Sequence, residues 1–93
     1  MKNIKIIKIR RKLDKLDDKF LKLIKKRTLL VNQVLANKKY KKEIVDNQRI
    51  KKILQNIRKK SIINKIDTKI TRRIWVNMIK AYIDYEFRKF RKK

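Results

Sequence analysis

The fold is decided by the stretch from residue 9 to residue 34, which reads IRRKLDKLDDKFLKLIKKRTLLVNQV. Side chains recur in it at alternating spacings of three and four residues, and all but one of them are apolar. These positions are Ile9, Leu13, Leu16, Phe20, Leu23, Arg27, Leu30 and Val34. Such spacing places them on one face of an α-helix, as a seam of the kind that packs on another helix.

The predicted first helix is long for so short a chain. We expect it to extend to about Lys39, which makes it roughly 45 Å long. A compact domain of this size has a radius of gyration of only about 12 Å. The chain therefore cannot cover the whole seam by itself, and we expect the seam to pack on a second copy of the chain.

Two further helices are expected. Residues 39–45 break the pattern and are predicted to form a loop, after which Asp46 is a suitable N-cap for the second helix. Residues 61–65 are predicted to connect the second helix to the third, for which Asp67 is the N-cap candidate. The apolar side of the second helix holds Ile50, Ile53, Leu54 and Ile57. The third helix carries one line of Ile70, Ile74, Met78, Ala81 and Tyr85, beside a second line of Trp75, Ile79, Tyr82 and Glu86. Its end is expected in the basic tail 88–93, where cations meet the negative end of the helix dipole.

The 93 residues contain no Gly, Pro, Cys or His. Their absence excludes disulfides, thiolate or imidazole metal sites, Ser/His or Cys/His catalysis and glycine-rich phosphate loops. Many-stranded β folds are disfavoured, because tight hairpins prefer Gly or Pro in their turns. We therefore predict an all-α chain, a single domain over residues 1–93, that works without metal or cofactor.

No apolar run approaches the roughly 20 residues that span a bilayer, and the first residues lack the apolar core of a secretion signal. We expect a cytoplasmic protein with no membrane contact. The formal charge of +24 leaves two interpretations open, a binder of nucleic acid or another anionic surface, and a drift of solvated positions towards lysine. The basic residues are spread along all three predicted helices without a known nucleic-acid-binding motif, so a nucleic-acid partner is the alternative.

Three cations of the first helix region are candidate ligand-binding residues. Arg27 occupies a seam position, where a guanidinium needs an anion. Lys38 lies 11 residues after Arg27. Eleven residues of helix rotate about the axis to within about 20° of the starting direction, so both cations can converge on one anionic ligand. Arg10 lies about 100° round the helix from Arg27 and can instead reach a site on a partner chain. The alternatives are a salt bridge of Arg27 to Asp17 or Asp46 and a solvated Lys38.

Three more charged residues stand out. Asp46 and Arg49 lie three residues apart, where they form either a cap with a helix pair or part of a site. Glu86 continues the apolar line of Trp75 in a chain with only eight acids. It is either a salt-bridge residue or a carboxyl held near an anionic ligand, where its protonated form donates a hydrogen bond.

Together these residues resemble the all-helical, type II chorismate mutases, which are small bacterial isomerases of the shikimate pathway to aromatic amino acids. The resemblance covers about residues 8–90. It is carried by IRRKLDKLD at 9–17, FLKLIKKR at 20–27, Lys38, VDNQR at 45–49, and IWVNMI at 74–79 leading to Tyr82 and Glu86. It implies an intertwined homodimer of three-helix chains with two sites shared between subunits, rearrangement of chorismate to prephenate, and no cofactor.

The resemblance also implies a role for each candidate residue. The residue matching Arg10 enters the site from the partner subunit, and the one matching Arg27 binds a substrate carboxylate. The one matching Lys38 binds a carboxylate and the ether oxygen. Those matching Asp46 and Arg49 hold the ring hydroxyl and the carboxylate end of the substrate.

The chain departs from the family pattern at three positions. Ile50 stands where a glutamate is frequent, Tyr82 where many members have a small hydroxyl residue, and Glu86 where many have a glutamine that contacts the ether oxygen. Tyr82 and Glu86 are accordingly expected in the substrate site. Two other functions stay open, an isochorismate pyruvate lyase on the same fold and a basic helical nucleic-acid binder without enzymatic activity.

Overall fold

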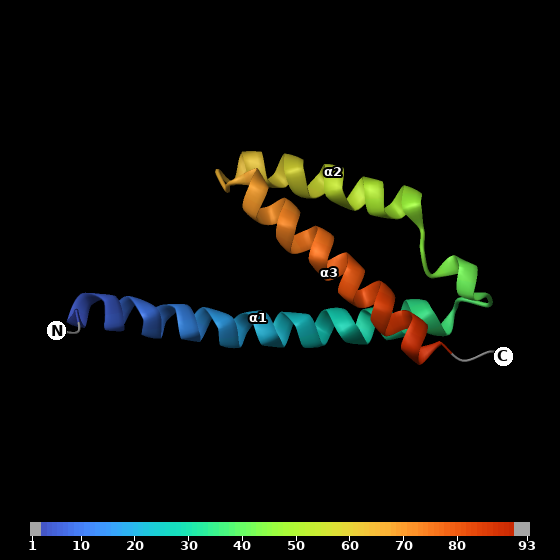
Figure 1. Ribbon diagram of the computed structural model, residues 1–93, viewed down its shortest axis with the longest axis horizontal. Coiled ribbons are helices and arrows are strands. Elements are labelled where there is room, and N and C mark those ends of the chain that lie inside the picture. Colours follow the sequence, from blue (N-terminus) through green and yellow to red (C-terminus); the bar gives the residue numbers. More distant parts are fainter. Residues whose placement is uncertain (1–2, 91–93) are drawn as a thin grey trace. The chain divides into compact units, whose positions relative to one another are not determined.

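The computed structural model describes residues 3–90, and Figure 1 shows its helices. In chain order they are α1 (Ile4–Ala36), the short 3₁₀ turn η1 (Lys41–Glu43), α2 (Asn47–Ile63) and α3 (Thr68–Lys89). No strand occurs among the described residues. The predicted all-α class with three helices is confirmed. Of the predicted basic tail 88–93, residues 91–93 lie outside the described residues.

The first helix differs from the prediction at its C-terminal end. It ends at Ala36 and not near Lys39. The amides of Asn37 and Lys38 donate to the carbonyl oxygens three residues before them, both at 3.0 Å, which tightens the last turn and stops the helix. The helical-angle argument that placed Lys38 on the same face as Arg27 is therefore wrong, because Lys38 lies beyond the helix.

The chain divides into two compact units within α1, at Gln33 and Val34. In the described part of the first unit α1 is a single helix whose seam is exposed. The seam residues Ile9, Leu13, Leu16, Phe20, Leu23 and Leu30 are each at least half exposed. A single helix cannot bury its own apolar face, because burial requires a second element that packs on it. The single domain over residues 1–93 and the intertwined dimer stay predictions.

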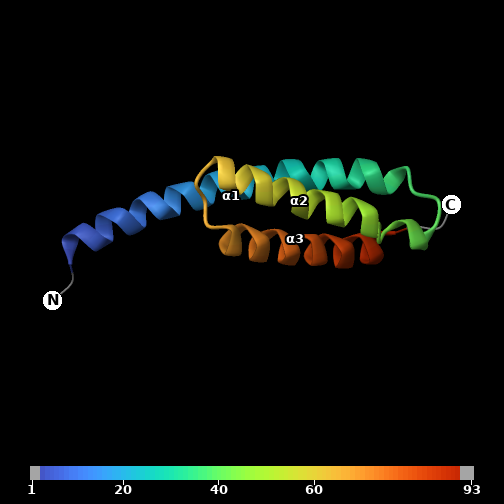
Figure 2. The ribbon, with the colours of Figure 1, turned by 90° about the horizontal axis from the view of Figure 1, so that it is seen from above.

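The second unit contains α2 and α3, which pack against each other as an antiparallel hairpin (Figures 1 and 2). Both predicted N-caps are confirmed. Asp46 Oδ1 accepts a hydrogen bond from the Arg49 amide at 3.0 Å. Asp67 Oδ1 accepts one from the Lys69 amide at 2.7 Å and a longer one from the Ile70 amide at 3.4 Å. Each cap satisfies amides at a helix start that have no partner within the helix.

The second helix is longer than predicted. It continues through Ser61 to Ile63, so the predicted connection over 61–65 is wrong in its first half. Ser61 is buried, and its hydroxyl donates to the Ile57 carbonyl oxygen at 2.6 Å, so the buried hydroxyl has a hydrogen-bond partner within the helix. The helix ends at Ile63. Just beyond this end, Lys65 adopts a φ of 57° and the amide of Ile66 donates to the Ser61 carbonyl oxygen at 2.8 Å. This is a Schellman ending with lysine at the position that usually holds glycine.

One loop residue is a core residue. Ile44 follows η1 and is only 3% exposed, the one buried hydrophobic side chain among residues 3–90. The loop around it is ordered by Glu43, whose Oε2 accepts from the amides of Lys39 at 2.7 Å and Tyr40 at 3.3 Å. The loop itself was predicted, but the burial of Ile44 was not.

Along α3, the second predicted line is the buried one. Trp75, Ile79 and Tyr82 are half-buried and Glu86 is buried. On the other line Ile70, Ile74 and Ala81 are exposed, while Met78 and Tyr85 are half-buried. The buried line therefore ends on a carboxylate. Across residues 3–90, none of the helices combines the length and hydrophobicity needed to cross a bilayer.

Candidate functional site

The second unit brings two of the predicted site residues into direct contact. Lys38 lies just beyond α1, and Glu86 lies in the last turn of α3. The Lys38 ammonium donates a hydrogen bond to Glu86 Oε1 at 3.0 Å. The side chains are 18% and 10% exposed, so this is a largely desolvated ion pair. The alternative of a solvated Lys38 is contradicted. The alternative of Glu86 as a salt-bridge residue is what the structure shows for the chain without a ligand, and its place in a substrate site stays a prediction.

This pair provides specific binding chemistry. A lysine ammonium carries three N–H donors, and the contact with Glu86 uses one. The others can serve an anionic ligand, with a carboxyl group held next to it. Removing either partner leaves a charge with little solvent around it, which is strongly unfavourable. An anion bound to Lys38 would therefore change the charge balance that Glu86 experiences.

Tyr82 lies one helical turn before Glu86 on the buried line of α3. Its ring meets that of Tyr85 edge to face, with 6.3 Å between the centroids and 87° between the planes. The Arg88 guanidinium lies 5.9 Å from the centroid of the Tyr85 ring and pairs with the exposed Asp84 at 2.9 Å. These contacts hold the Tyr85 ring against which Tyr82 packs. Tyr82 thus belongs to the same face as Glu86 but is backed by aromatic packing.

Asp46 and Arg49 are both exposed at the start of α2. The contact between them runs from the Arg49 amide to Asp46 Oδ1. Within the described chain their side chains do not form the predicted i,i+3 ion pair. The guanidinium of Arg49 is therefore available for a ligand, while one carboxylate oxygen of Asp46 is already used as a helix cap.

Arg10 and Arg27 belong to the first unit. Arg10 is exposed and Arg27 is half-buried on α1. Seventeen residues of helix separate them by roughly 25 Å along the axis. One small molecule cannot contact both arginines of the same helix, so a site that uses both needs two chains.

The spacing of residues along the sequence did not indicate which lysine meets Glu86, whereas the family resemblance assigns both Lys38 and Glu86 to the ether oxygen of the substrate. The two residues are 48 positions apart, and the chain offers 32 cations as partners. Only the tertiary arrangement selects one of them. Glu86 stood out in the sequence because it is a carboxylate on an otherwise apolar line of a helix. This spacing identified Glu86 but not its partner.

Residues 9–87 match the family model described as chorismate mutase type II. No curated protein and no solved structure matches the chain. The matched stretch contains both residues of the ion pair and the other five predicted site residues. The all-helical structure and the match over almost the whole chain agree, and the chain belongs to the type II chorismate mutase family.

Proposed function

We propose that the protein is a chorismate mutase, an isomerase that rearranges chorismate to prephenate. The observation that carries the proposal is the desolvated contact of Lys38 with Glu86 in a chain of this family. Lys38 and Glu86 are the residues to which the family pattern assigns the ether oxygen of the substrate.

The reaction needs little chemistry from the protein. Within one molecule, the C–O bond of the ether breaks while a new C–C bond forms, and no group leaves. The enzyme has to hold the dianionic substrate in its compact reactive conformer. It also has to stabilise the negative charge that develops on the ether oxygen as the C–O bond breaks. Fixed positive charges and hydrogen-bond donors meet both needs.

The candidate residues supply these groups. The Lys38 ammonium donates to the ether oxygen and to one carboxylate. Arg27 binds a carboxylate, for which the planar guanidinium provides two parallel donors. Asp46 and Arg49 hold the ring hydroxyl and the carboxylate end.

Glu86 has a different effect in each protonation state. As a carboxylate it holds the Lys38 ammonium, as in the ligand-free chain, but it repels the charge that develops on the ether oxygen. As a carboxylic acid it donates a hydrogen bond to that oxygen and releases Lys38 to the substrate. The protonated form is the one that favours the rearrangement if Glu86 faces the ether oxygen.

The active form in this proposal is a homodimer with shared sites. The exposed seam of α1 is the surface that a second copy covers. Arg10 of one chain completes the site that contains Arg27 and Lys38 of the other, since roughly 25 Å of helix separates the two arginines within one chain.

The test is to incubate the purified chain with chorismate and to follow the loss of ultraviolet absorbance together with the appearance of prephenate. A Lys38→Ala variant, prepared in the same way, controls for host enzymes, and Lys39→Ala, which changes an exposed neighbouring lysine, is the matched control. We expect activity in the wild type and in Lys39→Ala, and its loss in Lys38→Ala. A parallel incubation with isochorismate measures released pyruvate. Pyruvate release without prephenate formation would assign the lyase reaction instead.

A further inference from the structure

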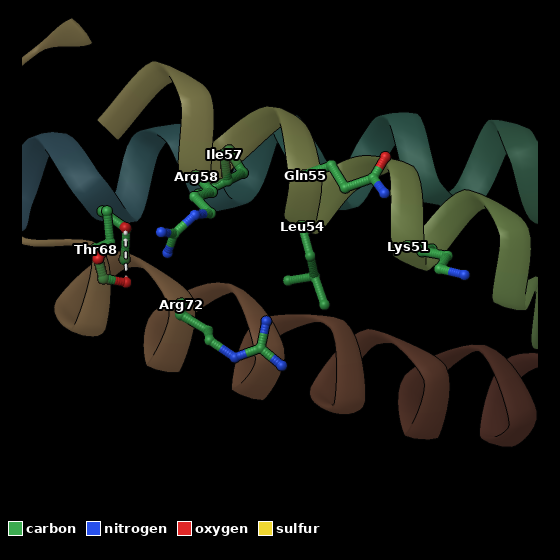
Figure 3. Close-up of a pocket in the computed structure, with 8 residues that line it drawn as sticks. Lys51, Leu54, Gln55, Ile57, Arg58, Thr68 and Arg72 are labelled. Atoms are coloured by element: carbon green, nitrogen blue, oxygen red, sulfur yellow. Dashed lines mark hydrogen bonds between the residues drawn. The ribbon is translucent and has the colours of Figure 1, made fainter. Parts of the chain in front are cut away.

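A concave site lies on the α2–α3 hairpin, away from the Lys38–Glu86 pair. It is a half-open cavity of about 270 Å³ between the two helices (Figure 3). Three cations line it, Lys51 and Arg58 from α2 and Arg72 from α3, and Leu54 and Ile57 give it an apolar wall. Arg72 and Glu86 are 14 residues apart on α3, or roughly 21 Å along the axis. The cavity is therefore separate from the proposed active site.

Within residues 3–90, no salt bridge neutralises the cations of this cavity. Asp67 is the only acid between residues 47 and 83. Its Oδ1 already accepts the two amides that begin α3. Among residues 3–90, no carboxylate pairs with either Arg58 or Arg72. Positive charge concentrated in a concave surface attracts anions more strongly than the same charge on a convex one.

The cavity is also held in shape. Thr71 forms part of its wall and is 8% exposed. Its hydroxyl forms a 2.8 Å hydrogen bond with that of Ser61, which ties α3 to α2 beside the cavity. In Figure 3, Arg58 reaches from α2 towards Thr68, while Arg72 reaches from α3 beneath Leu54. The two guanidinium groups thus come from opposite helices to one cavity.

We propose that this cavity binds a compact organic anion, with a carboxylate or phosphate group on an apolar body. The arginines supply planar, bidentate donors for the anionic group. Leu54 and Ile57 contact the apolar body. The volume lies near the lower end of the range for small-molecule sites, which limits the ligand to about the size of one substituted ring.

The binding test uses benzoate, phenyl phosphate, inorganic phosphate and benzyl alcohol as probes, titrated into the full chain. Calorimetry gives the Kd, and amide chemical shifts locate the site. Benzoate or phenyl phosphate should shift amides of Lys51, Arg58 and Arg72, and the tighter of the two identifies the preferred anionic group. Inorganic phosphate lacks the apolar body and should bind more weakly, and benzyl alcohol lacks the charge and should not bind. Absence of shifts at the cavity with both aromatic anions would overturn the proposal.

The matched variants separate this site from the general positive charge. Arg58→Gln with Arg72→Gln should raise the Kd at least ~10-fold, because two charge-assisted contacts are lost. Lys59→Gln with Lys80→Gln removes the same charge from the same helices outside the cavity, and should change the Kd less than ~2-fold, since exposed charges are screened. Equal weakening by both pairs would refute the site.

Two further variants complete the test. Arg58→Lys with Arg72→Lys keeps the charge but removes the bidentate geometry, and should still weaken binding more than the Lys59 and Lys80 control pair. Unchanged affinity in this variant would overturn the assigned role of the guanidinium groups. Lys38→Gln disables the proposed active site and should leave binding at the cavity intact. Loss of binding in Lys38→Gln would show that the probes occupy the active site instead.

Discussion

Arg27 interrupts an apolar seam with a charge, and in the proposed function it binds a substrate carboxylate. Arg27→Ala would remove this bidentate contact, which is strong where water is excluded. We expect kcat/KM to fall at least ~100-fold while the oligomeric state is retained. Steady-state kinetics with chorismate, together with light scattering, measures both. Near-normal activity in a folded Arg27→Ala protein would remove Arg27 from the site.

Glu86 stands where many members of the family have a glutamine, and this difference predicts that the activity depends on pH. If Glu86 faces the ether oxygen, as proposed, its carboxylate repels the charge that develops there and its protonated form donates a hydrogen bond, so activity should be higher at acid pH. Glu86→Gln provides a permanent donor of similar shape. This variant should keep its activity at higher pH and lose most of the acid preference.

The measurement for Glu86 is kcat/KM against pH for both proteins, over a range where both stay in the same oligomeric state. Asp84→Asn is a suitable control, since Asp84 is an exposed acid of the same helix whose pair with Arg88 lies at the surface. Superimposable profiles for wild type and Glu86→Gln would mean that another group faces the ether oxygen.

At the scale of the elements, the α2–α3 hairpin depends on a buried pair of hydroxyls. Ser61→Ala leaves the Thr71 hydroxyl buried, with only the 3.4 Å contact to the Thr68 carbonyl oxygen. A buried hydroxyl that loses its partner costs about 1–3 kcal/mol. Replacing both groups, in Ser61→Ala with Thr71→Val, removes the unsatisfied donor. We therefore expect the double variant to lose less stability than the sum of the two single variants, by at least ~0.5 kcal/mol.

Urea denaturation of the two single variants and the double variant, at one protein concentration, gives this coupling. Asn77→Ala serves as a surface control. It removes an exposed side-chain bond to the Arg73 carbonyl oxygen and should change the free energy of unfolding by less than about 0.5 kcal/mol. Strict additivity of Ser61→Ala and Thr71→Val would show that the two hydroxyls do not depend on each other.

For the whole molecule, the exposed seam of α1 predicts a dimer in solution. Leu16 is half exposed in the single chain, and burying that exposed half in each of two chains contributes roughly 1.5–3 kcal/mol per dimer. Leu16→Gln should therefore raise the dimer Kd at least ~10-fold. Lys15→Gln, on the adjacent exposed face, should leave it almost unchanged. A folded wild-type monomer at micromolar concentration in light scattering would contradict the architecture.

Sharing of the sites between subunits predicts complementation. In a heterodimer of an Arg10→Ala chain with an Arg27→Ala chain, one site carries both defects and the other carries none. Equal mixing of the two inactive proteins should leave about a quarter of all sites intact, since random pairing of a two-fold dimer makes half the dimers mixed. The measurement is mutase activity after subunit exchange has been confirmed by mass spectrometry. No recovery would mean that Arg10 does not complete the partner's site.

The sequence by itself determined the class of the fold and the starts of two helices. The seam from Ile9 to Val34 and the caps Asp46 and Asp67 are local features, because they depend on side chains within one or two helical turns of each other. Such features are independent of the rest of the chain, and the structure has them where the sequence predicted them. It also identified Glu86 as a carboxylate on a buried line.

Only the tertiary structure decided where α1 and α2 end and which residues meet. Ser61 continues α2 because its hydroxyl bonds Ile57 within the helix and Thr71 across the hairpin, and the second of these bonds has no local signature. The partner of Glu86 was likewise decided by packing, which buries Lys38 beside it and excludes the other lysines from that contact. Burial and the pairing of distant residues depend on how separate segments pack, so local spacing carries no information about a pair 48 residues apart. Before the structure, only the family resemblance had assigned Lys38 and Glu86 to the same substrate atom.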